Sequence, residues 1–264
     1  MCGHIILGRT ILGVRRVTTR LTGAALAALV GGGLGAMALS PATAGAAART
    51  PITAVATTTV VTKAAAAACA TGKYQKQVET YLKRIGGFGT ITVDGKQSAA
   101  DCAAIKKFQK RYGIQPAGGL AGPTTFDVAQ RIAATDIASC KAKKSGITFC
   151  VDLTHQTTWI MKNGKRYTNT TVTRTGMKNY RTPAGTFKIN KRTTKEWSDP
   201  YEVWLPYWQR FVGGRGFHQT TTYIHDKWRG SHGCANLLPQ DAKTYWNVGK
   251  IGMTVKVFGR RPGT

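Results

Sequence analysis

Acidic residues are scarce in this sequence, and their scarcity sets the charge of the whole chain. The 264 residues include 11 Asp and Glu against 38 Lys and Arg, which gives a formal net charge of +27 at pH 7. So strong a positive charge implies polyanionic surroundings. The basic residues are scattered rather than gathered into a Lys/Arg-rich run, and no RNA-binding signature is present, so we expect no nucleic-acid partner.

Common metal-binding motifs are also missing. The sequence contains neither HExxH nor CxxC, which excludes two familiar zinc signatures. The set His218, His225, His232 and Cys234 could in principle supply four zinc ligands. Histidines spaced by seven residues are not a familiar ligand pattern, however, so we predict no metal and no organic cofactor.

The N-terminal region has the three parts of a secretory signal peptide. Arginines at 9, 15, 16 and 20 precede an apolar run over residues 21–39, and small residues follow, including Ala42-Thr43-Ala44. This pattern predicts that residues 1–44 are removed on export. The alternative is a membrane anchor, because the apolar run is almost long enough to span a bilayer. Removal leaves 34 basic and 11 acidic residues, a formal charge of +23, and no stable membrane insertion.

An odd number of cysteines remains after residue 44. They are Cys69, Cys102, Cys140, Cys150 and Cys234, and an exported protein meets an oxidising compartment in which disulfides form. Four cysteines can pair in three ways. We favour Cys69 with Cys102 and Cys140 with Cys150, although the sequence leaves the other pairings open. Cys234 is then a free thiol that needs an explanation.

The first half of the remaining chain predicts a small helical domain. Residues 45–71 are rich in Ala and Thr and predict a flexible spacer. Residues 72–139 predict a bundle of three short helices, because "KYQKQVETYLKRIG" repeats apolar residues at helical spacing. Ser98 is the expected N-cap of the second helix and Gly113 its end. Pro123 is expected near the start of the third.

From residue 147 the pattern changes to that of β-strands. "ITFCVDL" and "TTWIMK" are β-rich runs, and Asn163-Gly164 predicts a two-residue hairpin turn. Only the segment that begins near Pro239 is helical in pattern. The sequence therefore predicts a multidomain α and mainly β protein, with a β-rich domain over residues 147–258, one helix near its end, and a basic tail over residues 259–264.

Aromatic residues are concentrated in "WSDPYEVWLPYWQRFVGGRG". We expect much of this stretch to be core, but it could also form the wall of a groove for an extended peptide. Tyr207, Trp208 and Arg215 are the side chains that we expect to contact a substrate, and the arginine would meet a carboxylate. The aromatic residues are Trp197, Tyr201, Trp204, Tyr207, Trp208 and Phe211.

The helical region resembles the peptidoglycan-binding domain-1 family. The stretch "FQKRYGIQPAGGLAGPTTFDVAQ" follows the family order FQ…G…DG…GP.T, except that Ala117-Gly118 stands where the family has its later DG. The resemblance implies binding to the peptide or glycan of a bacterial cell wall. A purely structural bundle remains the alternative.

The β-rich region resembles the L,D-transpeptidase (YkuD-type) catalytic domain over its full length. "TPAGTFKI" matches the TPxGxF element, "GFHQ" supplies a histidine, and "SHGCAN" supplies the nucleophile motif. His218 precedes His232 by 14 residues and Cys234 by 16, as the family pattern expects. The resemblance implies a β-sandwich in which Cys234 is the nucleophile, His218 the proton donor and acceptor, and His232 a base or orienting partner.

The residue types in "SHGCAN" suit a thiol nucleophile. A nearby imidazole can accept the thiol proton and favour the thiolate. Gly233 allows close approach of the backbone, and its N–H with that of Cys234 could bind an oxyanion. Ser231 can orient an imidazole by a hydrogen bond. Asn236 is expected to tie down the loop or to contact substrate.

The resemblance implies acyl transfer through a thioester. A tetrapeptide stem would acylate Cys234, and a side-chain amine of a neighbouring stem would take the acyl group to form a 3→3 cross-link. Expected partners are stem peptides, wall polyanions and carbapenem-type β-lactams as inhibitors, and the expected location is the bacterial cell wall. Transfer to water, which would make an L,D-carboxypeptidase, and a non-catalytic wall-binding protein remain alternatives.

Overall fold

The computed structural model describes residues 69–220 and 223–264 of the chain. The predicted signal peptide and nearly all of the predicted spacer lie outside these residues. Among the described helices, none is long and apolar enough to cross a membrane.

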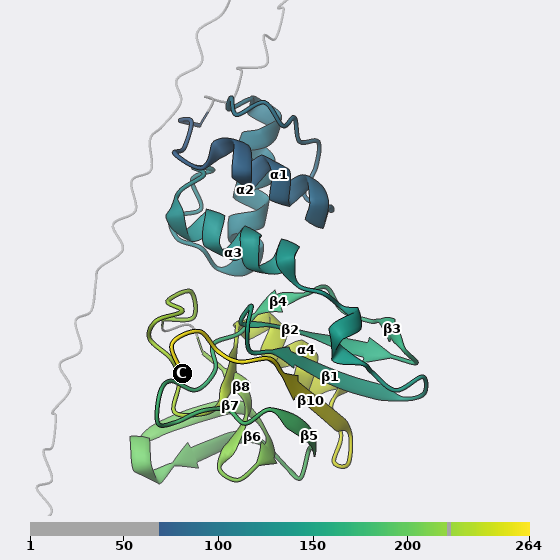
Figure 1. The fold of residues 1–264 in the computed structure, drawn as a ribbon. Helices are drawn as coiled ribbons and strands as arrows, with labels where there is room; N and C mark the ends of the chain where they lie inside the picture. Colours follow the sequence, from purple (N-terminus) through teal and green to yellow (C-terminus); the bar gives the residue numbers. More distant parts are fainter. Residues whose placement is uncertain (1–68, 221–222) are drawn as a thin grey trace, which may run out of the picture. The chain divides into compact units, whose positions relative to one another are not determined.

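The N-terminal described region consists of helices α1 (Gln75–Ile85), α2 (Ala99–Tyr112) and α3 (Pro123–Ala134) (Figure 1). The Ser98 side chain accepts a hydrogen bond from the N–H of Asp101, and the Asp101 carboxylate accepts one from the N–H of Ser98. This capping box satisfies two backbone donors at the start of α2. Gly113 ends the helix with a φ of 65°, a conformation that glycine adopts without strain. The predicted ends of α2 and the start of α3 are confirmed.

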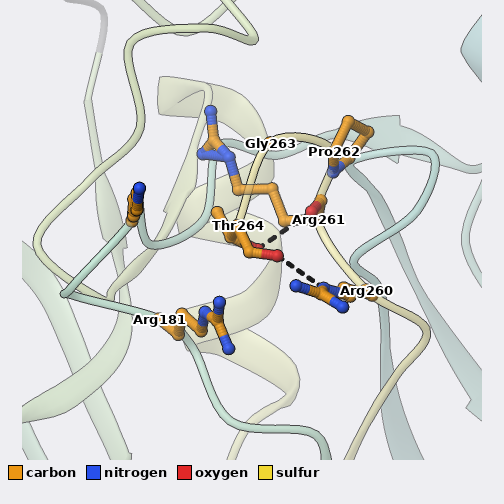
Figure 2. Close-up of a pocket in the computed structure, with 7 residues that line it drawn as sticks. Arg181, Arg260, Arg261, Pro262, Gly263 and Thr264 are labelled. Carbon is orange, nitrogen blue, oxygen red and sulfur yellow. Dashed lines mark hydrogen bonds between the residues drawn. The ribbon is translucent and has the colours of Figure 1, made fainter.

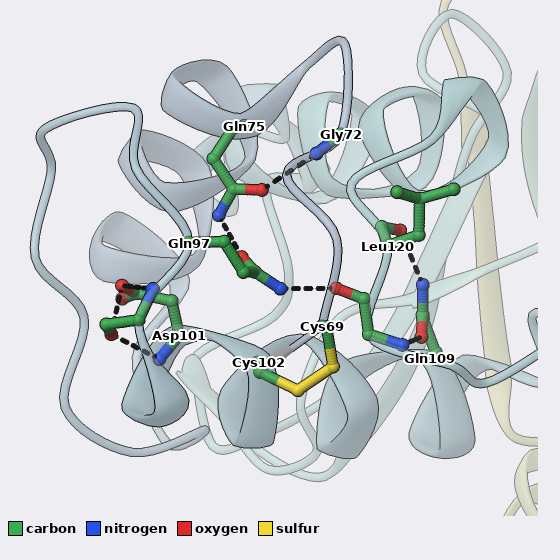
Figure 3. Close-up of a disulfide and its surroundings, with 10 residues drawn as sticks. Cys69, Gly72, Gln75, Gln97, Asp101, Cys102, Gln109 and Leu120 are labelled. Atoms are coloured by element: carbon green, nitrogen blue, oxygen red, sulfur yellow. Dashed lines mark hydrogen bonds between the residues drawn. A yellow bond between two sulfur atoms is a disulfide. The ribbon is translucent and has the colours of Figure 1, made fainter. Parts of the chain in front are cut away.

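Apolar faces of the three helices meet in one core. Its members include Val78, Leu82, Ile105, Phe108 and Val128, all of them fully buried. A disulfide between Cys69 and Cys102 joins the segment before α1 to α2 (Figure 3). Such a cross-link adds stability to a domain too small to bury a large core.

The C-terminal region contains two β-sheets. Strands β1 (Ile147–Asp152), β2 (Thr157–Lys162), β3 (Lys165–Arg166), β4 (Thr171–Val172), β5 (Gly185–Lys188) and β10 (Thr254–Phe258) form the first, in the order β3-β2-β1-β10-β5 with β4 beside β2. Strands β6 (Lys191–Ser198), β7 (Val203–Val212), β8 (Arg215–Gln219) and β9 (Ala235–Leu237) form the second, in that order. Short 3-10 helices cover Ala138–Cys140 and Asp199–Tyr201.

Local features of this region agree with the sequence. Asn163 and Gly164, with φ of 52° and 76°, form the turn between β2 and β3, as expected of a two-residue hairpin loop. A second disulfide joins Cys140 to Cys150. Both favoured cysteine pairings are therefore confirmed, and Cys234 is the free cysteine of the described residues.

The core of the C-terminal region lies between the two sheets. Phe149 and Val255 come from the first sheet, Phe217 and Leu237 from the second, and Tyr245 from helix α4 (Pro239–Val248). The rings of Phe149 and Phe217 are 5.8 Å apart between centroids. A helical region followed by a β-rich sandwich with a helix near the C-terminus is confirmed.

The aromatic residues of the stretch 197–211 are partly buried and partly exposed, so less of the stretch belongs to the core than we expected. Trp208 and Phe211 are buried, but Trp197, Tyr201 and Trp204 are exposed by 43%, 43% and 51%. The reason lies in the strand pairing. Strands β6 and β7 pair out to their connecting turn, whereas β8 pairs with β7 only over its last residues, 209–212. The outer part of the β6–β7 hairpin is thus a two-stranded ribbon without a third strand beside it (Figure 1).

Candidate active site

Two adjacent parallel strands bring the predicted catalytic residues together. His218 lies on β8 and is directly opposite Asn236 on β9. Cys234 comes two residues before Asn236, at the end of the loop that leads into β9. Parallel strands lie about 4.8 Å apart, so this pairing places the imidazole, the amide and the thiol at one edge of the second sheet.

A chain of hydrogen bonds fixes the orientation of His218. The guanidinium of Arg174 donates two bonds, of 3.0 and 2.9 Å, to Oδ1 of Asn236. The amide nitrogen of Asn236 lies 2.8 Å from Nε2 of His218, and Nδ1 of His218 lies 2.9 Å from the carbonyl oxygen of Gln219.

These contacts assign the proton of the imidazole. A guanidinium has no acceptor, so the oxygen of the Asn236 amide must face Arg174 and its NH₂ must face His218. Nε2 of His218 is therefore an acceptor without a proton, and Nδ1 carries the proton and donates to Gln219. His218 is held as the neutral tautomer that a general base requires.

Burial and charge keep His218 neutral. Burial above all, together with the charge of Arg174, lowers the pKa of His218 from 6.5 to about 4, while the hydrogen bond to Gln219 acts in the opposite direction. Burial also raises the pKa of the Cys234 thiol, while a backbone hydrogen bond at Gly216 and the charge of Arg215 lower it. Because burial disfavours both ions, the resting pair is a neutral thiol and a neutral imidazole.

The loop before Cys234 is held by its own hydrogen bonds. Ser231 Oγ donates to the carbonyl of Cys234 at 2.6 Å and accepts from the N–H of Gly233 at 3.1 Å. Ser231 thus braces the loop instead of orienting an imidazole. The Gly233 N–H, which the sequence offers as an oxyanion donor, is already occupied. Among the described residues the N–H of Cys234 has no such acceptor, so it is the better oxyanion donor.

Arg215 packs directly against this loop. Gly233 has a φ of 110°, and a methyl group added there would lie 2.6 Å from Nε of Arg215. Nε of Arg215 is buried and has no hydrogen-bond partner among the described residues. Glycine at this position lets the Arg215 side chain pack against the loop that carries the thiol, and its charge favours the thiolate.

His232 lies on the outside of the loop, between two tyrosines. The ring of Tyr201 stacks on the imidazole at 4.2 Å and 25°, and Tyr180 meets it edge-on at 4.7 Å and 84°. Among the described residues, neither His232 nor His218 forms a hydrogen bond with Cys234. His218 is buried with an unprotonated Nε2, whereas His232 is exposed and stacked on Tyr201, so His218 is the better candidate for the base.

The other predicted site residues lie at different depths. Trp208 is buried, with its ring 6.1 Å from that of His218. Tyr207 lies beside Trp246 of α4, at 6.2 Å between ring centroids. The sequence analysis did not predict Arg174 and Tyr180 as site residues. They lie more than 50 residues before the "SHGCAN" motif, and no local sequence pattern indicates that they fold against it.

An open basic pocket is not lined by the candidate catalytic residues. An open pocket of about 540 Å³ is lined by the basic side chains of Lys178, Arg181, Arg260 and Arg261 (Figure 2). Neither Cys234 nor a histidine lines it, so it is separate from the thiol. Over residues 69–220 and 223–264, no three His, Cys, Asp or Glu side chains gather as metal ligands.

Comparisons with known proteins place the chain in a family. Residues 147–257 match the model of the L,D-transpeptidase catalytic domain (YkuD), and residues 71–128 match that of a peptidoglycan binding domain (PG_binding_1). A crystal structure of L,D-transpeptidase (Yku) from Stackebrandtia nassauensis is 57% identical, with a TM-score of 0.72 over 74% of this chain and 96% of that chain. The chain therefore belongs to the L,D-transpeptidase family, with a YkuD catalytic domain preceded by a peptidoglycan binding domain.

More distant solved structures match only part of the chain. An L,D-transpeptidase from Mycobacterium smegmatis is 22% identical, with a TM-score of 0.39 over 44% of this chain and 59% of that one. L,D-transpeptidase 3 from Mycobacterium tuberculosis, in complex with a faropenem-derived adduct, is 18% identical, with a TM-score of 0.37 over 43% and 60%. None of the curated proteins matches the sequence.

Proposed function

We propose that this protein is an exported L,D-transpeptidase that forms 3→3 peptidoglycan cross-links through a thioester on Cys234. The observation that supports this most directly is the pairing of β8 with β9. It pairs His218 with Asn236, two residues after the free Cys234, and the hydrogen bonds of His218 leave Nε2 unprotonated and anchor Nδ1–H. A thiol with an oriented base is the arrangement of a cysteine nucleophile.

The proposed first step acylates the enzyme. Nε2 of His218 takes the thiol proton while the sulfur of Cys234 attacks the carbonyl between the third residue and the terminal D-Ala of a tetrapeptide stem. The N–H of Cys234 binds the oxyanion. The C–N bond then breaks, the imidazolium returns its proton to the leaving amine, and D-Ala departs. The Asn236 amide must leave Nε2 for the proton transfer to occur.

The second step transfers the acyl group. The side-chain amine of a neighbouring stem attacks the thioester, His218 takes the amine proton, and the sulfur leaves and regains a proton. The product is an amide between two third residues, and no cofactor takes part. Arg215 stabilises the sulfur anion as it forms and as it leaves, because its charge lies against the loop.

The remaining parts of the proposal concern the setting. Residues 72–139 bind the peptide or glycan of the wall. The mature protein is located in the cell wall, where its positive charge attracts wall polyanions. We propose a leader over residues 1–44, a catalytic domain over residues 147–258 and a basic tail over residues 259–264. A carbapenem-type β-lactam, which is a strained acyl donor, should acylate Cys234.

Intact mass spectrometry of the mature protein tests the proposal. The protein is incubated with a tetrapeptide stem, with and without a second stem as amine acceptor. We expect a mass gain that is absent in Cys234→Ala, and a new amide product when acceptor is present. Release of D-Ala with only tripeptide as product would identify an L,D-carboxypeptidase instead. A folded protein that gives neither adduct nor D-Ala would be a wall-binding protein.

A further inference from the structure

Exposed hydrophobic side chains gather at the end of the β6–β7 hairpin. Ten large hydrophobic side chains are exposed among the described residues, and four of them lie within residues 197–204: Trp197, Tyr201, Val203 and Trp204. We call residues 197–204 the aromatic tip. Single exposed hydrophobic residues need no explanation, but a cluster of them marks a binding surface.

The geometry of the aromatic tip leaves its two indoles partly exposed to solvent. Trp197 and Trp204 are directly opposite each other on β6 and β7, with centroids 5.1 Å apart and an edge-to-face angle of 62°. Nζ of Lys195 lies 4.4 Å from the Trp204 ring centroid. Since no third strand of the described chain pairs with this part of the ribbon, Trp197 and Trp204 stay 43% and 51% exposed.

The charge of the aromatic tip is opposite to that of the rest of the molecule. Residues 197–204 contain two acidic residues, Asp199 and Glu202, and no Lys or Arg, and Glu196 comes directly before them. Glu196 pairs with Lys191 at 2.5 Å. Asp199 and Glu202 are exposed, and neither forms an ion pair with a described residue. Free carboxylates accept hydrogen bonds from hydroxyl groups but repel anionic polymers and anionic membrane surfaces.

The aromatic tip is continuous with the candidate active site. Tyr201, in the turn between the two tryptophans, stacks on His232 at 4.2 Å. His232 is two residues before the nucleophile Cys234. A polymer that presents a stem to Cys234 therefore passes close to the exposed indoles.

We infer that the aromatic tip is a carbohydrate-binding subsite for the glycan strand that carries the donor stem. Sugar rings present faces of weakly positive C–H groups, which suit the negative faces of the Trp197 and Trp204 rings. Hydroxyl groups around the sugar rings donate to Asp199 and Glu202. A lipid surface fits less well, because the tip has one aliphatic side chain, Val203, and two free carboxylates. The assignment of the glycan as ligand rests on the proposed function.

Direct binding is tested with an uncharged sugar, the β-1,4-linked tetramer of N-acetylglucosamine. The Cys234→Ala protein, full-length after leader removal, is titrated while the indole N–H resonances are followed by NMR. Because the helical domain can also bind wall polymers, only the resonances of Trp197 and Trp204 count. We expect both to shift, and Trp204→Ala to weaken the affinity at the remaining indole about tenfold. Trp228→Ala, which removes an exposed indole outside the tip, is the matched control.

A second measurement connects the subsite with turnover. The ratio of kcat/KM for a disaccharide-linked stem to that for the bare stem should fall about tenfold in Trp204→Ala, and should not change in Trp228→Ala. Turnover without any shift of the tip resonances would overturn the subsite and leave the proposed function standing. Shifts without turnover of either substrate would refute the proposed function and leave the subsite. Shifts with anionic phospholipid vesicles, but not with the sugar, would make the tip a membrane contact.

Discussion

Asn236→Asp should reverse the electrostatic environment of His218. The amide nitrogen at this position lies 2.8 Å from Nε2 of His218, where a carboxylate oxygen would accept a hydrogen bond from protonated Nε2, which the amide nitrogen cannot do. The pKa of His218 is about 4 in the native protein. A carboxylate at this distance raises it by about 1 to 3. Because Arg174 also pairs with the new carboxylate, we expect the pKa to reach about 5 to 6.

The pH dependence of acylation measures this change. His218 must be neutral to accept the thiol proton, so the acid limb of the kcat/KM profile follows its pKa. The limb should lie near the native pKa of about 4 and should move up by about 1 to 2 in Asn236→Asp. NMR titration of the His218 ring in a Cys234→Ala background reports the same pKa without turnover.

Asn190→Asp is the matched control for this experiment. Oδ1 of Asn190 accepts a hydrogen bond of 2.7 Å from Nε of Arg210 at an exposed site, so the same change of charge is made beside an arginine but away from the imidazole. It should leave the acid limb in place. Equal acid limbs in the native protein and Asn236→Asp would refute the assigned tautomer and the role of His218 as base.

Three further predictions follow from burial, backbone conformation and chain topology. Since the pKa of His218 falls from 6.5 to about 4 on folding, the unfolded state binds more protons between these values. Stability to urea should therefore fall by about 3 kcal/mol as the pH is lowered through this window, and His218→Gln should remove most of the dependence. Gly233→Ala should displace Arg215 from the loop, because the φ of 110° is strained for alanine and the new methyl group would meet Arg215. Without the charge of Arg215 the thiolate is less favoured, so alkylation of Cys234 by iodoacetamide should slow about tenfold or more. An unchanged alkylation rate would contradict the role of the guanidinium. Replacing Cys69 and Cys102 together by alanine should lower the free energy of unfolding by about 3 to 4 kcal/mol, because the disulfide closes a separation of 33 residues. A loss below about 1 kcal/mol in chemical denaturation would argue against a stabilising role of this disulfide.

Features encoded by a few adjacent residues could be predicted from the sequence. The Ser98 cap, the Asn163-Gly164 turn and the start of α4 at Pro239 each depend on backbone chemistry within about one turn of chain. The free state of Cys234 followed from counting cysteines. The structure places these features as the sequence indicates, whereas the proximity of Cys234 to His218 is what the family resemblance implies.

Features that depend on strand register could not be predicted. Arg174 reaches Asn236 because two distant segments meet through an isolated bridge, and no local pattern encodes that pairing. The exposure of Trp197 and Trp204 arises from the short overlap between β7 and β8. A large aromatic residue predicts burial in general, so composition alone could not separate the buried Trp208 and Phe211 from the exposed Trp197 and Trp204.

The position of β10 has a consequence for how the catalytic domain is made. This strand, Thr254–Phe258, lies between β1 and β5 inside the first sheet and is parallel to β1. Its partner β1 begins more than a hundred residues earlier, at Ile147, and contacts between such distant segments form slowly. During synthesis, the sheet cannot close until almost the whole domain has emerged. The core that the first sheet shares with β8 and β9 should therefore be completed late in the folding of the domain.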